Sequence, residues 1–378
     1  MKTLKIIPFV LLLFLSLSEI NGQPQQGKLI QTIIPAPSLS NNLLYIPDNQ
    51  YISVYLPPSY DKTDKLYPVV YYLPGFGDFV YYYTEYGVFQ GFSLKSSMDE
   101  LINRGQINEM IIVIVNGQHF SGGSFYVNSP VTGNWEDFIV KDVVGYVDKN
   151  YRTIKEVKSR AISGHSMGGF GALNIAMHFP DIFGVVYSLS PGLFDKNGLK
   201  KSILFINEER INKYLISINQ FNNLISDKAC AKFINYVSNL LMTTNDFNTA
   251  FDFAYGMAFS PNPSGSVPYI NYPYTQKDNK LIVNDSLMKK YENGFGGWDE
   301  KMKKYKTNLL RLQGIVIDVG NQDNYVWIRE GCDYFHKLLN ENGIKNDLSI
   351  HEGGHQDKLK ERIEQHMLPY FSKMFNNQ

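Results

Sequence analysis

The sequence predicts an α/β protein built on a mostly parallel, eight-stranded sheet with helices on its faces. Short β-branched or aromatic runs alternate with helix-like segments along most of the 378 residues, a pattern typical of parallel strands joined by helices. A turn with glycines at its first and last positions, residues 164–168, joins one apolar run to a helix-like segment. The alternation is interrupted once, at residues 192–312, which indicates an insertion on the sheet and not a second domain.

The expected strands, in chain order, lie at residues 29–34, 51–56, 69–73, 110–115, 161–163, 185–189, 315–319 and 348–351. Helices are expected at 96–104, 135–149, 168–178 and 328–340, the last ending before the helix stop Gly343. The insertion lies between the sixth and seventh strands and combines a helical part with a Pro- and aromatic-rich stretch from 259 to 274. We expect it to form either a cap over one edge of the sheet or a solvent-exposed loop region without a role in a site.

The N-terminus has the pattern of an export signal. Lys2 and Lys5 flank the start of an apolar run at residues 6–17, which has the length of a signal-peptide core and is short for a membrane span. We predict a signal peptide at 1–22, cleaved after Ser18 or Gly22, and a single domain at 23–378; an uncleaved anchor is the alternative. The mature protein is expected to be secreted or periplasmic, without stable membrane insertion.

The composition limits which partners, disulfides and cofactors the protein can have. Lys and Arg total 36, as do Asp and Glu, so no net field favours a nucleic-acid partner. Cys230 and Cys332 allow one disulfide or two buried thiols. The sequence has no paired C-x-x-C and no acidic loop with calcium spacing, and neither a metal nor a cofactor is expected.

Ser166 is the candidate nucleophile. It stands at the centre of Gly164-His165-Ser166-Met167-Gly168, between the strand at 161–163 and a helix-like segment, which is the context of a nucleophile elbow. The glycines permit a turn in which bulky side chains would collide, so the hydroxyl is held above the sheet edge. A serine hydroxyl is a weak nucleophile and needs a histidine base that a carboxylate orients.

Asp323 and His355 are the candidate acid and base. Asp323 follows the strand at 315–319 in a turn, whereas the rival Asp318 lies inside that strand and would point to a face of the sheet. His355 follows the last strand and two glycines; the rival His351 lies on the strand itself. The order serine, acid, histidine is the one that this class of fold uses.

The oxyanion of acyl transfer needs backbone N–H donors. We expect one from Met167, directly after the nucleophile, and one from Phe76 in the segment Leu73-Pro74-Gly75-Phe76-Gly77-Asp78 after the third strand. A plain turn is the alternative interpretation of that segment, because Pro-Gly is a common turn signal.

These motifs together resemble the putative-esterase family of α/β-hydrolases, which contains feruloyl esterases, S-formylglutathione hydrolases and mycolyltransferases. The matching segments are Tyr71-Tyr72-Leu73-Pro74-Gly75, Gly133-Asn134-Trp135-Glu136-Asp137-Phe138, residues 164–169, residues 318–323 and Gly353-Gly354-His355. The resemblance covers about residues 50–375 outside the insertion. It implies an α/β-hydrolase fold and the same roles for Ser166, Asp323, His355 and the amides of Phe76 and Met167. Two departures are Pro74, where many members have histidine or aspartate, and the long interval between Ser166 and Asp323.

The expected function is that of a secreted serine carboxylesterase. The resemblance implies an ester substrate on plant polysaccharide, such as feruloyl or acetyl xylan. Tyr126, Trp135 and Tyr274 are candidates for lining the substrate pocket, with core packing as the alternative. An acyltransferase with a sugar acceptor is the second hypothesis; a peptidase and a non-catalytic binding module on the same fold are others.

Overall fold

The structure is a computed structural model that describes residues 25–84, 91–202, 205, 207–221, 226–278 and 280–376. The predicted signal peptide at 1–22 lies outside the described residues. No helix within those ranges is both long and apolar enough to cross a membrane.

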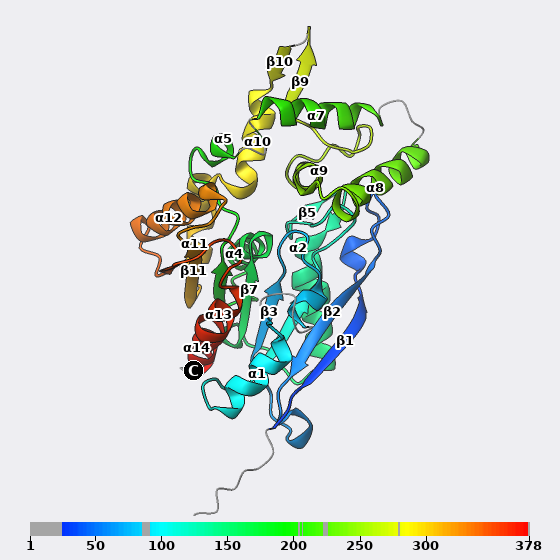
Figure 1. Ribbon diagram of the computed structural model, residues 1–378. Coiled ribbons are helices and arrows are strands. Elements are labelled where there is room, and N and C mark those ends of the chain that lie inside the picture. The colour runs from blue at the N-terminus through cyan, green and yellow to red at the C-terminus, as the bar shows by residue number, and fades with distance from the viewer. Residues whose placement is uncertain are drawn as a thin grey trace, which may run out of the picture.

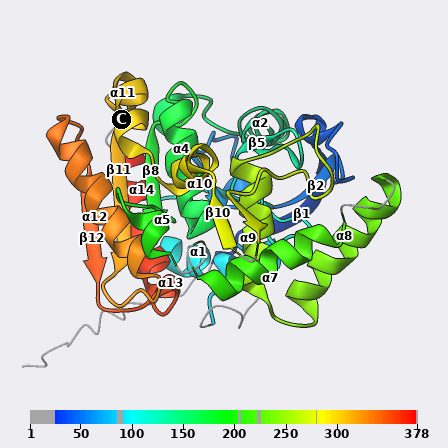
Figure 2. The ribbon, with the colours of Figure 1, turned by 90° about the horizontal axis from the view of Figure 1, so that it is seen from above.

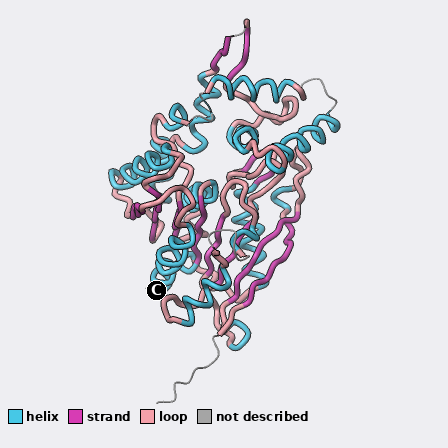
Figure 3. The backbone as a smooth tube through the Cα atoms, viewed as in Figure 1, coloured by secondary structure: helices cyan, strands magenta, loops and turns pink. Residues whose placement is uncertain are grey.

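An eight-stranded sheet forms the centre of the molecule (Figures 1 and 3). Its strands follow the spatial order β1-β2-β4-β3-β7-β8-β11-β12. Strands β1 and β2 are antiparallel to each other, β2 is antiparallel to β4, and the remaining neighbours are parallel. The bounds are β1 Lys28–Pro35, β2 Asn49–Leu56, β3 Val69–Leu73, β4 Ile111–Val115, β7 Arg160–His165, β8 Val185–Leu189, β11 Gly314–Gly320 and β12 Asp347–His351. All eight predicted strands are confirmed within two residues at each end.

Helices cover both faces because alternate residues of each strand point to opposite sides. In β3, Val69, Tyr71 and Leu73 join one apolar core, and Val70 and Tyr72 join the other. The second core contains α1 (Leu94–Asn103) and the C-terminal run α13 (Leu359–Arg362), η6 (Ile363–Met367) and α14 (Leu368–Asn376). The first contains the run α2 (Trp135–Asp137), η4 (Phe138–Val143) and α3 (Val144–Asn150), with α4 (Met167–His178) and α12 (Val326–Glu341).

Four helical segments are found where the sequence predicts them, with one difference of detail. Residues 138–143, within the second, are π-helical and not α-helical. The C-terminal helices were not among the predicted elements. A two-residue pair, β5 (Asn128–Ser129) and β6 (Gly133–Asn134), also lies outside the prediction.

The segment 192–312, which the sequence analysis interprets as an insertion, lies between β8 and β11. It contains α5 (Gly198–Lys201), α7 (Glu208–Asn219), α8 (Ser226–Met242), α9 (Phe247–Phe259), β9 (Tyr274–Lys277), β10 (Lys280–Val283), α10 (Asp285–Phe295) and α11 (Trp298–Leu309). Figure 1 shows α7, α8 and α9 beyond one end of the sheet, and in Figure 2, seen from above, α7 and α8 lie along the lower edge of the view. Cys230 of α8 and Cys332 of α12 are both buried and free, so the disulfide alternative is wrong.

Candidate active site

Ser166 lies at a sharp turn between β7 and α4. Its backbone has φ 57° and ψ −114°, a strained conformation for a residue with a side chain. The two glycines are required sterically: a Cβ on Gly168 would lie 1.8 Å from the Leu73 carbonyl oxygen, and one on Gly164 would lie 2.4 Å from the Gly168 carbonyl oxygen. The turn therefore holds the serine above the sheet edge at the start of a helix.

His355 and Asp323 form a directly bonded pair. The imidazole Nδ1–H donates to the Asp323 Oδ2 at 2.7 Å, and Asp323 Oδ1 accepts from the Tyr325 N–H at 2.8 Å. The Asp323 side chain is fully buried, so its carboxylate is held in one orientation. This arrangement leaves His355 Nε2 available as a base.

The loops that carry this pair are joined to each other by backbone contacts. The Asn321 N–H donates to the His351 carbonyl, and the Gln322 N–H donates to the Gly353 carbonyl, each at 2.9 Å. A Cβ on Gly320 would lie 2.2 Å from the Gly353 carbonyl oxygen. The close approach therefore depends on Gly320, whereas Gly353 and Gly354, the two glycines before His355, have no positive φ.

The rivals Asp318 and His351 occupy a separate site. Asp318 is buried and pairs with the Arg362 guanidinium, with Nη2 at 2.6 Å, while Tyr187 donates to it at 2.5 Å. His351 Nε2 lies 3.7 Å from Asp318 Oδ1. Neither residue lines the pocket that Ser166 and His355 share.

Residues 351–355 spell H-E-G-G-H, a pattern that binds zinc when both histidines lie on one helical face. Here His351 ends strand β12, whereas His355 lies in the following loop. The two rings face different carboxylates, Asp318 and Asp323. Among the described residues, no group of three His, Cys, Asp or Glu side chains could hold a metal ion.

In the loop after β3, the N–H groups on either side of Phe76 are hydrogen-bonded. The Gly75 N–H donates to the Asp78 carboxylate at 3.1 Å, and the Gly77 N–H donates to the Gly122 carbonyl at 2.7 Å. Within the described chain, no hydrogen bond is made by the N–H groups of Phe76 or Met167. These are the two donors that the sequence predicts for the oxyanion.

The peptide that carries the Phe76 N–H is fixed from its other side. Its carbonyl, that of Gly75, accepts from the Gln118 amide and from the Asp78 N–H, each at 3.2 Å. Asp78 also accepts from the Tyr83 hydroxyl at 2.7 Å, and burial raises the pKa of Asp78 to about 6. Because C=O and N–H are antiparallel across a trans peptide, fixing the carbonyl orients the donor.

His165, next to the serine, supports the base loop. Its Nε2–H donates to the His355 carbonyl at 2.9 Å, and burial lowers the pKa of His165 to about 3. The ring is thus neutral at ordinary pH and acts as a fixed hydrogen-bond donor.

A pocket of about 420 Å³ brings these groups together. Ser166, Met167, Phe76 and His355 all line it. Among the described residues, no hydrogen bond joins the Ser166 hydroxyl to the imidazole; such bonds in free enzymes are often long and tighten when substrate binds. The remaining wall is largely aromatic and comes from Tyr82, Phe247, Phe251, Phe295, Tyr325 and Trp327.

Tyr126 and Trp135 do not line this pocket, so the prediction that they bind substrate is corrected. Both are 0% exposed. Tyr126 lies against Gly117 and Gly171, where added Cβ atoms would clash with its ring, and its hydroxyl donates to the Pro74 carbonyl at 2.9 Å. It therefore supports the loop that carries Phe76.

Trp135 and Tyr274 are also core residues. Trp135 Nε1–H donates to the Thr132 carbonyl at 2.9 Å, and the Tyr274 hydroxyl donates to the Phe205 carbonyl at 2.8 Å. Polar ends satisfied inside the fold are the usual state of buried tryptophan and tyrosine.

Apart from Phe76, the aromatic residues that line the pocket are not among the residues predicted to bind substrate. Phe247 and Phe251 stand at i and i+4 on α9, a spacing that places them on one helical face. Trp327 follows Asp323 by four positions. Phe247 and Phe251 lie four positions apart in the segment expected to form a cap. That spacing is the sequence signal that could have identified this wall.

A serine at a strand-to-helix turn, on a sheet of this order, defines the α/β-hydrolase class. The chain belongs to the Putative esterase family, whose model matches residues 45–376. The resemblance found in the sequence is thus confirmed.

Two curated relatives match part of the chain. Esterase Rv1288 of Mycobacterium tuberculosis is 34% identical over 132 residues, which are 35% of this chain and 26% of that protein. The endo-1,4-beta-xylanase/feruloyl esterase of Xylanibacter ruminicola is 29% identical over 207 residues, 50% of this chain and 28% of that protein. The matched segments therefore span less than a third of either relative.

Two solved structures show the same fold. A ferulic acid esterase superimposes with a TM-score of 0.57 at 20% identity, over 92% of this chain and 99% of that one. FphF, a fluorophosphonate-binding serine hydrolase of Staphylococcus aureus, superimposes with a TM-score of 0.54 at 16% identity, over 93% and 99% of the two chains.

Proposed function

We propose that this esterase is an exported serine hydrolase that uses Ser166, His355 and Asp323 to cleave aromatic acyl esters of plant polysaccharide. The observation that carries the proposal is the hydrogen-bonded His355–Asp323 pair beside the pocket that Ser166 also lines. The basic and apolar N-terminus supports export. The xylanase/feruloyl esterase relative supports the substrate class.

The chemistry follows from the positions of the groups. The Ser166 oxygen attacks the acyl carbonyl while His355 takes the hydroxyl proton, and the resulting oxyanion accepts hydrogen bonds from the Phe76 and Met167 N–H groups. His355 then gives the proton to the leaving alcohol as the ester bond breaks. Water attacks the acyl-enzyme by the same route, which releases the acid and regenerates Ser166.

The walls of the pocket favour an aromatic acyl group over acetyl. Phe247, Phe251 and Trp327 offer ring faces and edges to a planar substituent, and aromatic pairs contribute about 0.5–1.5 kcal/mol each beyond burial. An acetyl group would leave most of the 420 Å³ unfilled. We expect kcat/KM for a feruloyl ester to exceed that for the acetyl ester of the same alcohol at least tenfold.

Labelling with a fluorophosphonate probe tests the assignment of the nucleophile. The probe phosphonylates activated serine hydroxyls, so one adduct is expected on the peptide that contains Ser166. Ser166→Ala should abolish the adduct and lower ester hydrolysis by about 10³-fold or more while the protein stays folded. An adduct on another serine, or a variant with activity within threefold of the parent, would overturn the proposal.

A further inference from the structure

Two further pockets adjoin the catalytic pocket, each sharing lining residues with its neighbour. A pocket of about 810 Å³ shares Gly77, Tyr82 and Phe247 with the catalytic pocket. A third, of about 390 Å³, shares Tyr51, Asn116, Gln118, His119 and Phe120 with the second. We call the second and third pockets together the extended groove. Each has the size of a site for a drug-sized ligand, roughly 300–1,000 Å³, so the groove is far larger than a small leaving alcohol requires.

The extended groove is lined without formal charge. Among the described residues that line it, none is Asp, Glu, Lys or Arg. Its one histidine, His119, is neutral because burial lowers its pKa to about 3. A charged ligand placed here would lose hydration without gaining an ionic partner, so the groove selects against charge.

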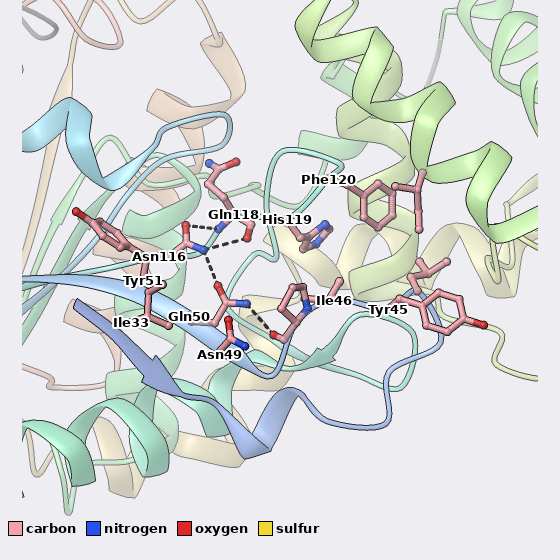
Figure 4. Close-up of a pocket in the computed structure, with 13 residues that line it drawn as sticks. Ile33, Tyr45, Ile46, Asn49, Gln50, Tyr51, Asn116, Gln118, His119 and Phe120 are labelled. Atoms are coloured by element: carbon pink, nitrogen blue, oxygen red, sulfur yellow. Dashed lines mark hydrogen bonds between the residues drawn. The ribbon is translucent and has the colours of Figure 1, made fainter. Parts of the chain in front are cut away.

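Amide groups in fixed positions form the floor of the third pocket (Figure 4). The Asn116 amide donates to the Gln50 side chain at 2.7 Å and to the Gln118 carbonyl at 3.2 Å. The Gln50 amide in turn donates to the Pro47 carbonyl at 3.0 Å, and Asn49 is exposed beside it. Both amide hydrogens of Asn116 are used within this network. The groups left for a ligand are the second lone pairs of the amide oxygens, the second Gln50 N–H and the exposed Asn49 amide, which together can accept from hydroxyl groups and donate to them.

Exposed aromatic rings border the same groove. Tyr45 is 67% exposed and its backbone has φ 55°, a strained conformation that the β1–β2 loop maintains. Tyr81 is 41% exposed and stacks on Phe79, with centroids 5.5 Å apart and planes at 17°. Flat apolar rings with a polar end suit ligands that are apolar on one face and hydroxylated at the rim.

The insertion supplies the opposite wall. Ile234, Ser238, Leu241 and Met242 of α8 line the groove, and their spacing places them on one face of that helix. The segment 192–312 therefore forms one wall of the extended groove, which begins at the pocket that Ser166 lines.

We propose that the extended groove binds a neutral sugar chain, the alcohol part of the substrate, which runs from Ser166 past Tyr81 to Tyr45. Hydroxyls meet the amides of Asn49, Gln50 and Asn116, and sugar faces pack on the exposed rings. The inference rests on the proposed function, because it assigns the groove to the leaving-group side of the ester.

Calorimetric titration of the full chain carrying Ser166→Ala tests this without turnover. The probes are xylohexaose, cellohexaose, xylobiose and hexagalacturonate. At least one neutral hexamer should bind, and both xylobiose and hexagalacturonate should bind at least tenfold more weakly than that hexamer. The preferred hexamer distinguishes a xylan-type from a glucan-type chain. Absence of binding by both neutral hexamers at millimolar concentration, or equal binding of hexagalacturonate, would refute the assignment.

Variants in the same background locate the binding site. Tyr45→Ala and Tyr81→Ala should each weaken binding of the hexamer at least fivefold. Ile216→Ala is the matched control, because Ile216 is 71% exposed on α7 and lines none of the three pockets. Undiminished binding by both tyrosine variants would place the sugar elsewhere. Fluorophosphonate labelling of the parent separates the two proposals: labelled Ser166 without sugar binding rejects the groove alone.

Discussion

His355 Nδ1 lies 2.7 Å from Asp323 Oδ2, while His351, four residues earlier, faces Asp318. Two histidine–carboxylate pairs thus stand side by side at the ends of β11 and β12. The Asp323 pair lies at the pocket that Ser166 lines, and the Asp318 pair is tied to Arg362 in the interior. The two pairs should respond differently to substitution.

Asp323→Asn should lower kcat by about 10³–10⁴-fold, because an amide cannot hold the imidazole in the tautomer that accepts the serine proton. The free energy of unfolding should change by only about 1 kcal/mol. Hydrolysis of a chromogenic ester and urea unfolding measure the two effects. A kcat within tenfold of the parent would show that Asp323 is not the orienting acid.

Asp318→Asn should act on stability. Removing this charge leaves the Arg362 guanidinium buried without its ion pair, which costs about 3–5 kcal/mol. Urea unfolding should show that loss, while kcat per folded molecule stays within threefold of the parent. If Asp318→Asn instead lowered kcat without changing stability, Asp318 and not Asp323 would be the acid that orients the histidine.

Tyr126→Phe should lower kcat roughly tenfold, equivalent to about 1.4 kcal/mol, with little change in KM. The Pro74 carbonyl loses its donor, so the neighbouring peptide that presents the Phe76 N–H is less firmly held. Tyr214→Phe is the matched control, since the buried Tyr214 hydroxyl has no hydrogen-bond partner among the described residues. A rise in KM at constant kcat would instead indicate direct substrate binding by Tyr126.

Asp78 should make stability depend on pH. Burial raises its pKa from 3.8 to about 6, so between those values the folded protein keeps a proton that the unfolded chain releases. The stability that this group contributes is therefore present below about pH 4 and is lost as pH rises through about 6. Relative to Asp78→Asn, the free energy of unfolding of the parent should fall by roughly 2 kcal/mol from pH 4 to 7. Parallel urea-unfolding profiles for the two proteins would contradict this.

Gly168→Ala should destabilise the fold by about 3 kcal/mol or more and abolish activity, because the new methyl would lie 1.8 Å from the Leu73 carbonyl oxygen. Gly145→Ala is the control. Gly145 lies in α3 with nothing within 4 Å of an added Cβ, so alanine should stabilise the protein by about 0.5–1 kcal/mol. Thermal denaturation measures both. Equal effects of the two substitutions would show that the elbow tolerates a side chain.

The sequence alone determined the sheet and located the candidate triad. Strands such as 69–73 and 185–189 are short apolar runs whose neighbours along the chain suffice to predict them. Ser166, Asp323 and His355 each follow a predicted strand, and the carboxyl ends of parallel strands meet at one edge. The hydrophobic pattern of each segment and the order of the segments along the chain were therefore sufficient to predict the sheet and the candidate triad.

Only the tertiary structure decided which aromatic side chains reach the pocket. Tyr126 and Trp135 were candidates for the pocket wall, yet both are buried in the core, whereas Phe247 from the insertion and Trp327, four positions after Asp323, line the site. The packing of α8 and α9 over the sheet edge likewise created the extended groove. The physical reason is that local periodicity fixes secondary structure, while the direction a side chain faces depends on contacts between segments far apart in the chain.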